Sequence, residues 1–100
     1  MDGEELLQRY ASGERDFSGA DLREAGIFNG SRRLFFKDAI FKGVNLSGIT
    51  EYRIDFSRAD LSNACLEGTD IKYSNLRRAN LSGANLRGAD LTGVDPIRFG

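Results

Sequence analysis

Residues 79–93 read ANLSG-ANLRG-ADLTG, three copies of a five-residue unit. The same frame runs without a gap from residue 34 to residue 98, and a second block of three units fills residues 15–29. Residues 30–33 separate the two blocks. Of the sixteen units, fourteen have Leu, Ile or Phe at the third position, eight have Ala at the first, and eleven have Asp or Asn at the second. The repeat therefore accounts for most of the chain.

A period of five excludes the two regular secondary structures. The α-helix repeats every 3.6 residues and the β-strand every two, so neither keeps one face apolar over consecutive units. A short extended piece followed by a turn satisfies the pattern. The first and third positions then point inward, one small and one large, while the other positions lie outside or form the corner, where Gly is often found. A tandem array of such units indicates a solenoid.

A tandem run of A(D/N)LXX units resembles the pentapeptide repeat family, and the resemblance covers residues 15–98. It implies an all-β fold, a right-handed quadrilateral β-helix with four units per coil and about four coils. We expect a single domain over residues 1–100. An N-terminal helix before such repeats also resembles many cyanobacterial proteins, which suggests a bacterial source.

Counting residues 30–33 as one short or looped side places the third-position side chains in four columns. The predicted columns are Phe17, Phe36, Phe56 and Leu76; Leu22, Phe41, Leu61 and Leu81; Ile27, Leu46, Leu66 and Leu86; and Arg32, Glu51, Ile71 and Leu91. All of these residues except Arg32 and Glu51 form the expected core. A matching column of small residues is Ala20, Ala39, Ala59 and Ala79.

The fourth column is irregular because Arg32 and Glu51 stand where Leu is expected. Either residues 30–33 and 49–53 bulge outward as loops, or Arg32 and Glu51 pair across adjacent coils. The bulge is favoured, since a buried ion pair carries a large desolvation cost.

Stacked coils leave apolar ends that need caps. We expect residues 2–12 to form a capping helix, with Asp2 as N-cap, Glu5 at the third helical position and Gly13 after its end. Its apolar stripe is Leu6, Leu7 and Tyr10. At the other end, Pro96 cannot donate to a further strand. Two arrangements remain open there: dimerisation through the C-terminal coil, which the resemblance supports, and a lid formed by Ile97 and Phe99.

Composition excludes several classes of function. The net charge is −1, His is absent and Cys occurs once, so no His-based catalytic pair, His metal ligand or disulfide framework exists. No calcium-binding loop or nucleotide-binding glycine motif occurs, and we expect neither metal nor cofactor. The Asp and Asn of the second position are better explained by local backbone hydrogen bonds, and Cys65 by an incidental surface thiol. Without a signal sequence or membrane span, we expect a cytoplasmic protein, although a processed chain would look the same.

Basic and aromatic residues gather at outward positions near the corner between the fourth and first sides. The candidate partner-binding residues are Tyr52, Arg53, Lys72, Tyr73, Arg58, Arg77 and Arg78. Such groups can bind an anionic or protein partner. Interspersed Asp55, Asp70 and Asp90 weaken the positive field, so a solvated mixed surface is the alternative.

Two functions are compatible with these features. The first is a non-catalytic β-helical interaction or scaffold module with an unknown protein partner. The second, implied by the resemblance, is a DNA-mimicking binder or protector of a type II topoisomerase such as DNA gyrase. The balanced charge and the short rod disfavour the DNA-mimicking function. The balanced charge also disfavours a nucleic acid as the partner.

The predicted core gives a first test. Leu66→Asp puts a carboxylate into the third column, where burial of a charge carries a penalty of several kcal/mol, on the order of the whole stability of a small domain. We expect this variant not to fold. Circular dichroism during heating measures the outcome, and a cooperative melt at the wild-type temperature would refute the register.

Overall fold

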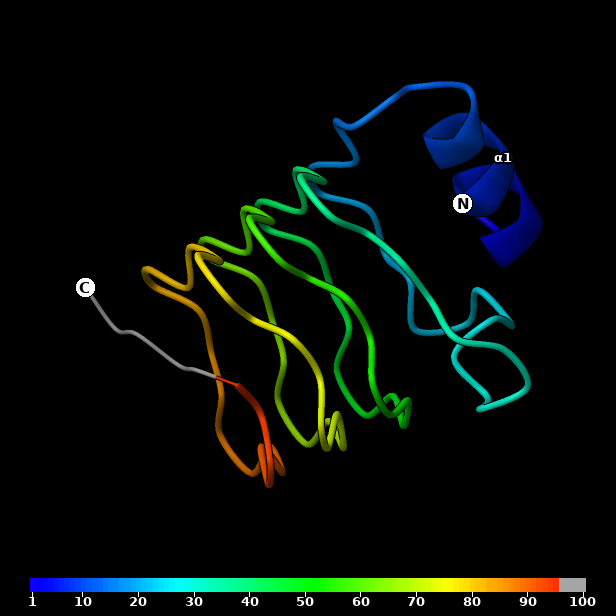
Figure 1. Ribbon diagram of the computed structural model, residues 1–100. Coiled ribbons are helices and arrows are strands. Elements are labelled where there is room, and N and C mark those ends of the chain that lie inside the picture. Colours follow the sequence, from blue (N-terminus) through cyan, green and yellow to red (C-terminus); the bar gives the residue numbers. More distant parts are fainter. Residues whose placement is uncertain (96–100) are drawn as a thin grey trace.

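The structure is a computed structural model and describes residues 1–95. One helix, α1 (Gly3–Ala11), lies at one end of a coil that carries the rest of the chain toward the opposite end (Figure 1). Within residues 14–95 the coils touch through isolated parallel β-bridges rather than longer strands. The molecule measures 30 × 24 × 19 Å.

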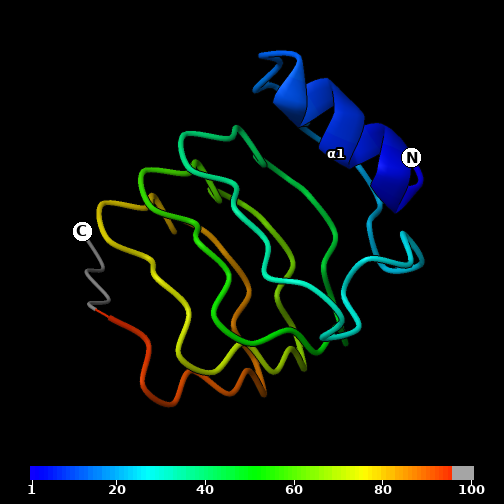
Figure 2. The same ribbon diagram turned by 45° about the vertical axis from the view of Figure 1, so that its right-hand side comes forward.

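Each turn of the coil contains twenty residues from residue 34 onward. Second-position residues bridge their counterparts one coil later, at Phe35–Asp55, Ile40–Asp60, Asn45–Cys65 and Thr50–Asp70. The next coil repeats this pattern, from Asp55–Asn75 to Asp70–Asp90. Four bridged sides per coil result, and Figure 2 shows the coils stacked on one another. The register predicted for this block is present.

Backbone hydrogen bonds between coils hold each side in place. Phe36 N–H donates to Asp55 O at 2.7 Å, and Asp38 N–H donates to Ser57 O at 3.0 Å. In the reverse direction, Asp55 N–H donates to Leu34 O at 2.9 Å. Because buried backbone groups must be paired, each unit needs a unit one coil away.

A tight turn forms the corner after each third-position residue. At one such corner Ala59 N–H donates to Phe56 O at 3.0 Å, and Arg58 has φ +60°. A positive φ at the third residue of the turn is the geometry of a type II turn.

The Asp and Asn of the second position brace the adjoining turn. In nine units a side-chain oxygen of this residue accepts the N–H two residues on, at 2.9–3.2 Å. These local bonds confirm the backbone role predicted for the repeated Asp and Asn.

The columns predicted for the first block are wrong by one side. Asp16 bridges Ile40 and Asp21 bridges Asn45, so the first two coils differ by 24 residues. Phe17 therefore lies over Phe41, not Phe36, and their ring centroids are 5.7 Å apart.

The same shift moves the other members of the first block. Leu22 lies over Leu46, and by the same offset Ile27 falls on the side of Glu51. Ala20 belongs with Val44, because Asn45 N–H donates to Ala20 O, so the predicted column of four alanines is also wrong. The physical reason is that residues 30–33 are inserted between two sides and do not replace one.

Residues 49–53 do not bulge outward, contrary to the favoured prediction. Ile49 and Glu51 are buried, and Glu51 N–H donates to Asp70 O at 2.9 Å in the regular pattern. The alternative pairing is also wrong, since Arg32 is exposed and its guanidinium lies 3.1 Å from Glu4. The Glu51 carboxylate instead accepts the backbone N–H of Gly30 at 3.0 Å, which anchors the inserted loop.

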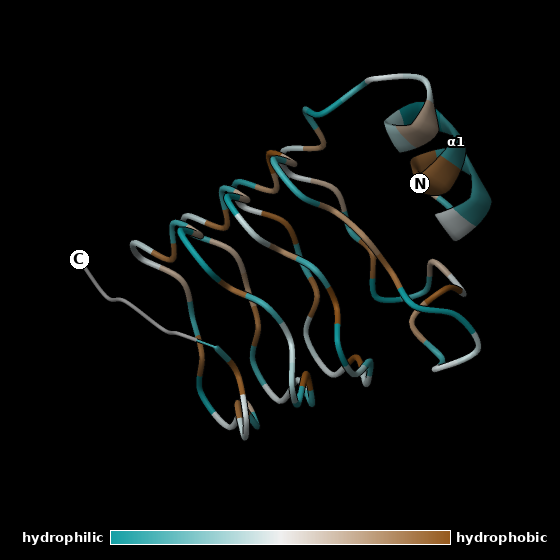
Figure 3. Ribbon diagram, viewed as in Figure 1, coloured by the Kyte–Doolittle hydropathy of each residue, from teal (hydrophilic) through white to brown (hydrophobic). Residues whose placement is uncertain are grey.

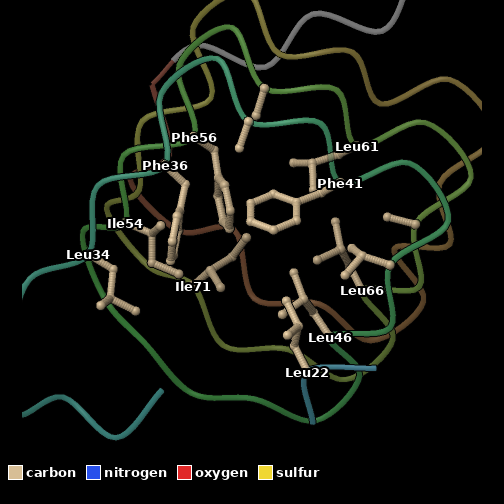
Figure 4. Packing of buried hydrophobic residues seen from close by; sticks show 14 of the residues in the cluster. Leu22, Leu34, Phe36, Phe41, Leu46, Ile54, Phe56, Leu61, Leu66 and Ile71 are labelled. Carbon is tan, nitrogen blue, oxygen red and sulfur yellow. The ribbon is translucent and has the colours of Figure 1, made fainter. Parts of the chain in front are cut away.

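The core runs along the inside of the coil (Figures 3 and 4). Phe36 and Phe56 stack with centroids 6.3 Å apart, and Phe41 meets both edge-on. Each buried Leu or Phe contributes about 1.5–3 kcal/mol before ordering costs. Of the predicted core, Leu86 and Leu91 near the C-terminal end are only partly buried. The predicted lid of Ile97 and Phe99 and the role given to Pro96 lie outside the described residues.

Helix α1 covers the first coil. The Asp2 side chain accepts the Glu5 N–H at 2.8 Å at its start. At its end Gly13 has φ +104°, and Glu14 N–H donates to Arg9 O, which is a Schellman cap. Among residues 1–95 no helix has the length and hydrophobicity needed to cross a membrane.

The helix docks through its apolar stripe. Leu6 is fully buried. The ring of Tyr10 meets Phe36 edge-on at 5.7 Å, and its hydroxyl donates to Lys37 O at 2.7 Å. Since the inserted loop leaves no earlier unit above Phe36, Tyr10 covers the open end of that column.

Gly3 packs directly against the coil and is buried. Its N–H donates to Ala25 O at 2.7 Å. A Cβ at this position would lie 2.6 Å from the same carbonyl oxygen and closer still to the Ile27 side chain. The Ala25 carbonyl oxygen is a backbone atom, so it cannot move aside as the end of a flexible side chain could.

We therefore expect Gly3→Ala to lower the free energy of unfolding by about 1–3 kcal/mol, the usual cost of overpacking. Gln8→Ala, on the exposed face of α1, is the matched control and should change stability little. Denaturant titration measures both. Equal stability of the two variants would contradict this docking geometry.

Candidate interaction surface

One side of the coil differs from the other three. We call it side A, the stacked units 34–38, 54–58 and 74–78. Its first edge is the corner that precedes it, where Arg53 and Tyr73 lie. Its second edge is the corner that follows it, formed by Asp38, Arg58 and Arg78.

Backbone conformation sets these two edges apart. Six residues other than Gly have positive φ within residues 1–95, and five of them are the edge residues of side A. The sixth is Asn63. Most other corners carry Gly, as at Gly43 and Gly48. The left-handed region costs about 1–2 kcal/mol for residues with a Cβ, so side chains are placed along side A at some cost in stability.

A hollow of about 500 Å³ lies at the first edge, and we call it the tyrosine hollow. Tyr52 and Tyr73 are among its walls and are about half exposed, at 45% and 54%. The inserted loop forms another wall, and Glu51 is 3% exposed. The lining residues are Gly30, Ser31, Arg32, Arg33, Glu51, Tyr52, Arg53 and Tyr73.

Arg33 ties the loop to this edge. Its Nε donates to Arg53 O at 3.1 Å, and its guanidinium lies 5.1 Å from the centroid of the exposed Phe35 ring. The tyrosine hollow thus combines exposed aromatic rings with arginines, which are the residue types enriched in protein interfaces.

Lys72 is less available than its outward position predicts. Its Nζ lies 2.9 Å from Asp70 and 3.2 Å from Asp90, and 5.3 Å from the centroid of Tyr52. Hydrogen bonds to these two carboxylates raise the pKa of Lys72. Tyr52 also donates to Asp70 at 3.2 Å, while the other oxygen of Asp70 is buried without a partner in the described residues. This group therefore orients Tyr52 rather than presenting a free cation.

A second hollow of about 260 Å³ lies toward the second edge, and we call it the basic hollow. Its charged lining residues are all cationic. The lining residues are Lys37, Ser57, Arg58, Asn75, Arg77 and Arg78. Arg77 lies 3.3 Å from Asp95, but both side chains are mostly exposed, so solvent screens the pair.

The structure divides six of the seven predicted surface residues between two places, and the seventh, Lys72, lines neither hollow. Tyr52, Arg53 and Tyr73 line the tyrosine hollow; Arg58, Arg77 and Arg78 line the basic hollow. Sequence reasoning missed Lys37, which stands one coil before Ser57 at the fourth position. Because the fourth position of the unit faces outward, the position of Lys37 in its unit could have identified it as a surface residue. Sequence reasoning also missed Glu51 as a wall, because a carboxylate there was expected to loop out.

The remaining candidate groups form no chemical site. Cys65 is half-buried at a second position and bridges Asn45 and Asn85 in the regular ladder. Within the described residues, Cys and acidic side chains do not gather in threes as metal ligands would.

These observations define a class of protein, a four-sided parallel β-solenoid whose turns repeat every five residues. The family model described as pentapeptide repeats matches residues 54–95 in eight copies. Residues 54–95 of the chain therefore consist of pentapeptide repeats, and proteins with such repeats are commonly non-enzymatic. The match to this family model implies that the coil is a right-handed β-helix.

Solved structures of pentapeptide repeat proteins resemble the chain. HetL from Nostoc sp. strain PCC 7120, a pentapeptide repeat protein involved in heterocyst differentiation regulation, is 28% identical with a TM-score of 0.51. The alignment covers 99% of this chain and 51% of HetL, so the chain spans about half of HetL's length.

Two further structures are more distant. Rfr23 from Cyanothece is 25% identical, with a TM-score of 0.38 and coverage of 83% of this chain and 60% of Rfr23. A pentapeptide repeat protein of the Arabidopsis thaliana thylakoid lumen is 28% identical, with a TM-score of 0.32 and coverage of 84% and 69%. No curated protein matches the chain significantly in sequence.

Asp90, one of the two carboxylates that pair with Lys72, gives a pH-dependent prediction. The Thr92 hydroxyl and N–H, together with Lys72, lower the pKa of Asp90 to about 2. Because this value lies below that of an unfolded chain, near 3.9, the contribution of Asp90 to stability is present above pH 4 and is lost as the pH falls toward 2.

Asp90→Asn keeps an acceptor for the Thr92 N–H but removes the titrating proton. We expect the free energy of unfolding to fall less steeply between pH 4 and pH 2 in this variant, as measured by denaturant titration across that range. Asp38→Asn, at an exposed turn position, is the control. An identical slope for Asp90→Asn and the wild type would contradict the assignment.

Proposed function

We propose that the chain is a non-catalytic protein-interaction module that binds a protein partner through side A and its two edges. The observation that carries this proposal is the placement of five strained side chains along the two borders of one side. At most other corners Gly makes the same turn without strain. Because these side chains lower the stability of the fold, we expect them to serve a function such as binding.

The chemistry of side A supports a protein partner. Half-exposed tyrosines and arginines lie next to two hollows, and these residue types contribute most of the affinity in many interfaces. The tyrosine hollow can accept a side chain, and the basic hollow can accept an anionic group. The first and third positions of nearly every unit are used by the core, so recognition is left to the outward positions.

The polarity of side A also separates this proposal from the DNA-mimic alternative. A protein that imitates DNA presents an acidic surface, because DNA carries a regular row of phosphates. Here the charged lining of the basic hollow is cationic, and three arginines lie around the tyrosine hollow. The cationic character of side A therefore disfavours a type II topoisomerase as the partner.

Glycine substitutions test this proposal without disturbing the turns. In the fourfold variant Arg53→Gly, Arg58→Gly, Tyr73→Gly and Arg78→Gly, four of the five edge residues are replaced by the residue best suited to a positive φ. Each substitution removes about 1 kcal/mol of backbone strain from the folded state. It also adds about 1 kcal/mol of conformational entropy to the unfolded state, because Gly is more flexible. These two effects oppose each other, so the free energy of unfolding should change little. Asn63→Gly, at a corner away from side A, is the matched control.

The readout is quantitative capture of partners from a lysate of the native organism, compared across the three proteins at equal thermal stability. We expect a partner that the wild type and Asn63→Gly capture equally and that the fourfold variant loses. A partner retained by the fourfold variant at the wild-type level would place the interface elsewhere.

A further inference from the structure

We propose that the basic hollow binds a phosphomonoester group carried by a phosphorylated side chain of the protein partner. This inference rests on the proposed function and names the chemistry that side A recognises. It follows from how the coil arranges four cations, which groups are already paired, and how large the hollow is.

The backbone ladder fixes the cations in register. Asp38 N–H donates to Ser57 O at 3.0 Å, and Arg58 N–H donates to Arg77 O at 2.9 Å. Lys37, Ser57 and Arg77 therefore occupy the same position in three consecutive coils, which lie about 4.8 Å apart. Arg58 and Arg78 follow at the adjoining corner. The rigid stack brings cations from three coils to one hollow before any ligand arrives, which lowers the ordering cost of binding.

The charge of the hollow matches a dianion better than a carboxylate. Among the described residues its lining contains three arginines and one lysine and no acidic residue. Three carboxylates lie near it. Asp55 accepts the Ser57 N–H at 2.9 Å, Asp38 is exposed at the second edge, and Asp95 lies 3.3 Å from Arg77 in an exposed pair that solvent screens. A phosphomonoester carries nearly two charges and three acceptor oxygens, and arginine forks bind it in a bidentate manner.

Neutral donors complete the hollow. The Asn75 side-chain oxygen accepts the Arg77 N–H at 2.9 Å, so the end of this lining side chain that remains to bind a ligand is its donor, the amide NH₂ group. Ser57 adds a hydroxyl at the wall. A phosphate oxygen can therefore accept uncharged hydrogen bonds as well as charged ones, as at other phosphate sites.

The shape of the hollow favours a phosphorylated side chain over a nucleic acid. About 260 Å³ is smaller than the usual pocket of a drug-sized ligand, and suits a single small group. Unpaired bases stack on aromatic rings, and none of the residues within 1–95 that line the basic hollow is aromatic. The whole chain has a net charge of −1, which disfavours the long-range attraction of a polyanion.

Fluorescence anisotropy with three labelled probes tests the inference: a phosphoserine peptide, the same peptide without the phosphate, and a short oligothymidylate. We expect the wild type to bind the phosphoserine peptide at least about tenfold more tightly than the unphosphorylated peptide, and more tightly than the oligonucleotide. The double variant Arg58→Gly and Arg78→Gly should lose this preference by about tenfold, while Asn63→Gly should keep it.

Equal affinity for the two peptides would overturn the inference, as would tighter binding of oligothymidylate or an unchanged preference in the double variant. These failures are separable from failure of the proposed function. If the fourfold glycine variant loses its captured partner but no phosphate preference exists, side A is still the interface and only the ligand chemistry is wrong. If side A binds neither partner nor phosphopeptide, both proposals fail.

Discussion

Most backbone hydrogen bonds of the coil reach a unit in the neighbouring coil, which from residue 34 onward is about twenty residues away. A single five-residue unit closes its own turn, but its remaining N–H and C=O groups reach only the coils before and after it. The positive φ at the fifth position makes this arrangement possible, because it turns the chain through a corner and returns the next unit to the same ladder. Apolar burial then follows, since the first and third positions are left facing inward. The end caps are needed for the same reason, as α1 shows at the first coil.

The sequence predicted the periodic part of the fold well. Units 34–38 to 89–93 follow one another without a gap, so four units per coil is enough to set their register. The first block could not be placed in the same way, because a four-residue segment can stand for one short side or be inserted between two. Phe17 fits an aromatic column in either phase, over Phe36 or over Phe41, and composition does not distinguish the two.

The candidate surface was only partly predictable. Outward positions identified the arginines and tyrosines, because position within the unit determines which side chains face out. Position does not show which charges are already paired, as Lys72 is with Asp70 and Asp90. Nor does it reveal that Glu51 stays within the coil: the penalty for its burial is met by the Gly30 N–H of a loop distant in sequence, a contact that only the folded chain creates.

The uniform ladder after residue 34 makes the chain modular in steps of twenty. Cutting out one coil, for example from residue 57 to residue 76, would join chemically similar backbone positions and leave each column continuous. Duplicating the same stretch would lengthen the rod by one coil without altering either end. The inserted loop and α1 restrict such changes to the C-terminal side, because the first coil is built to be covered. Gene duplication can thus extend this architecture in one direction only, away from the helix.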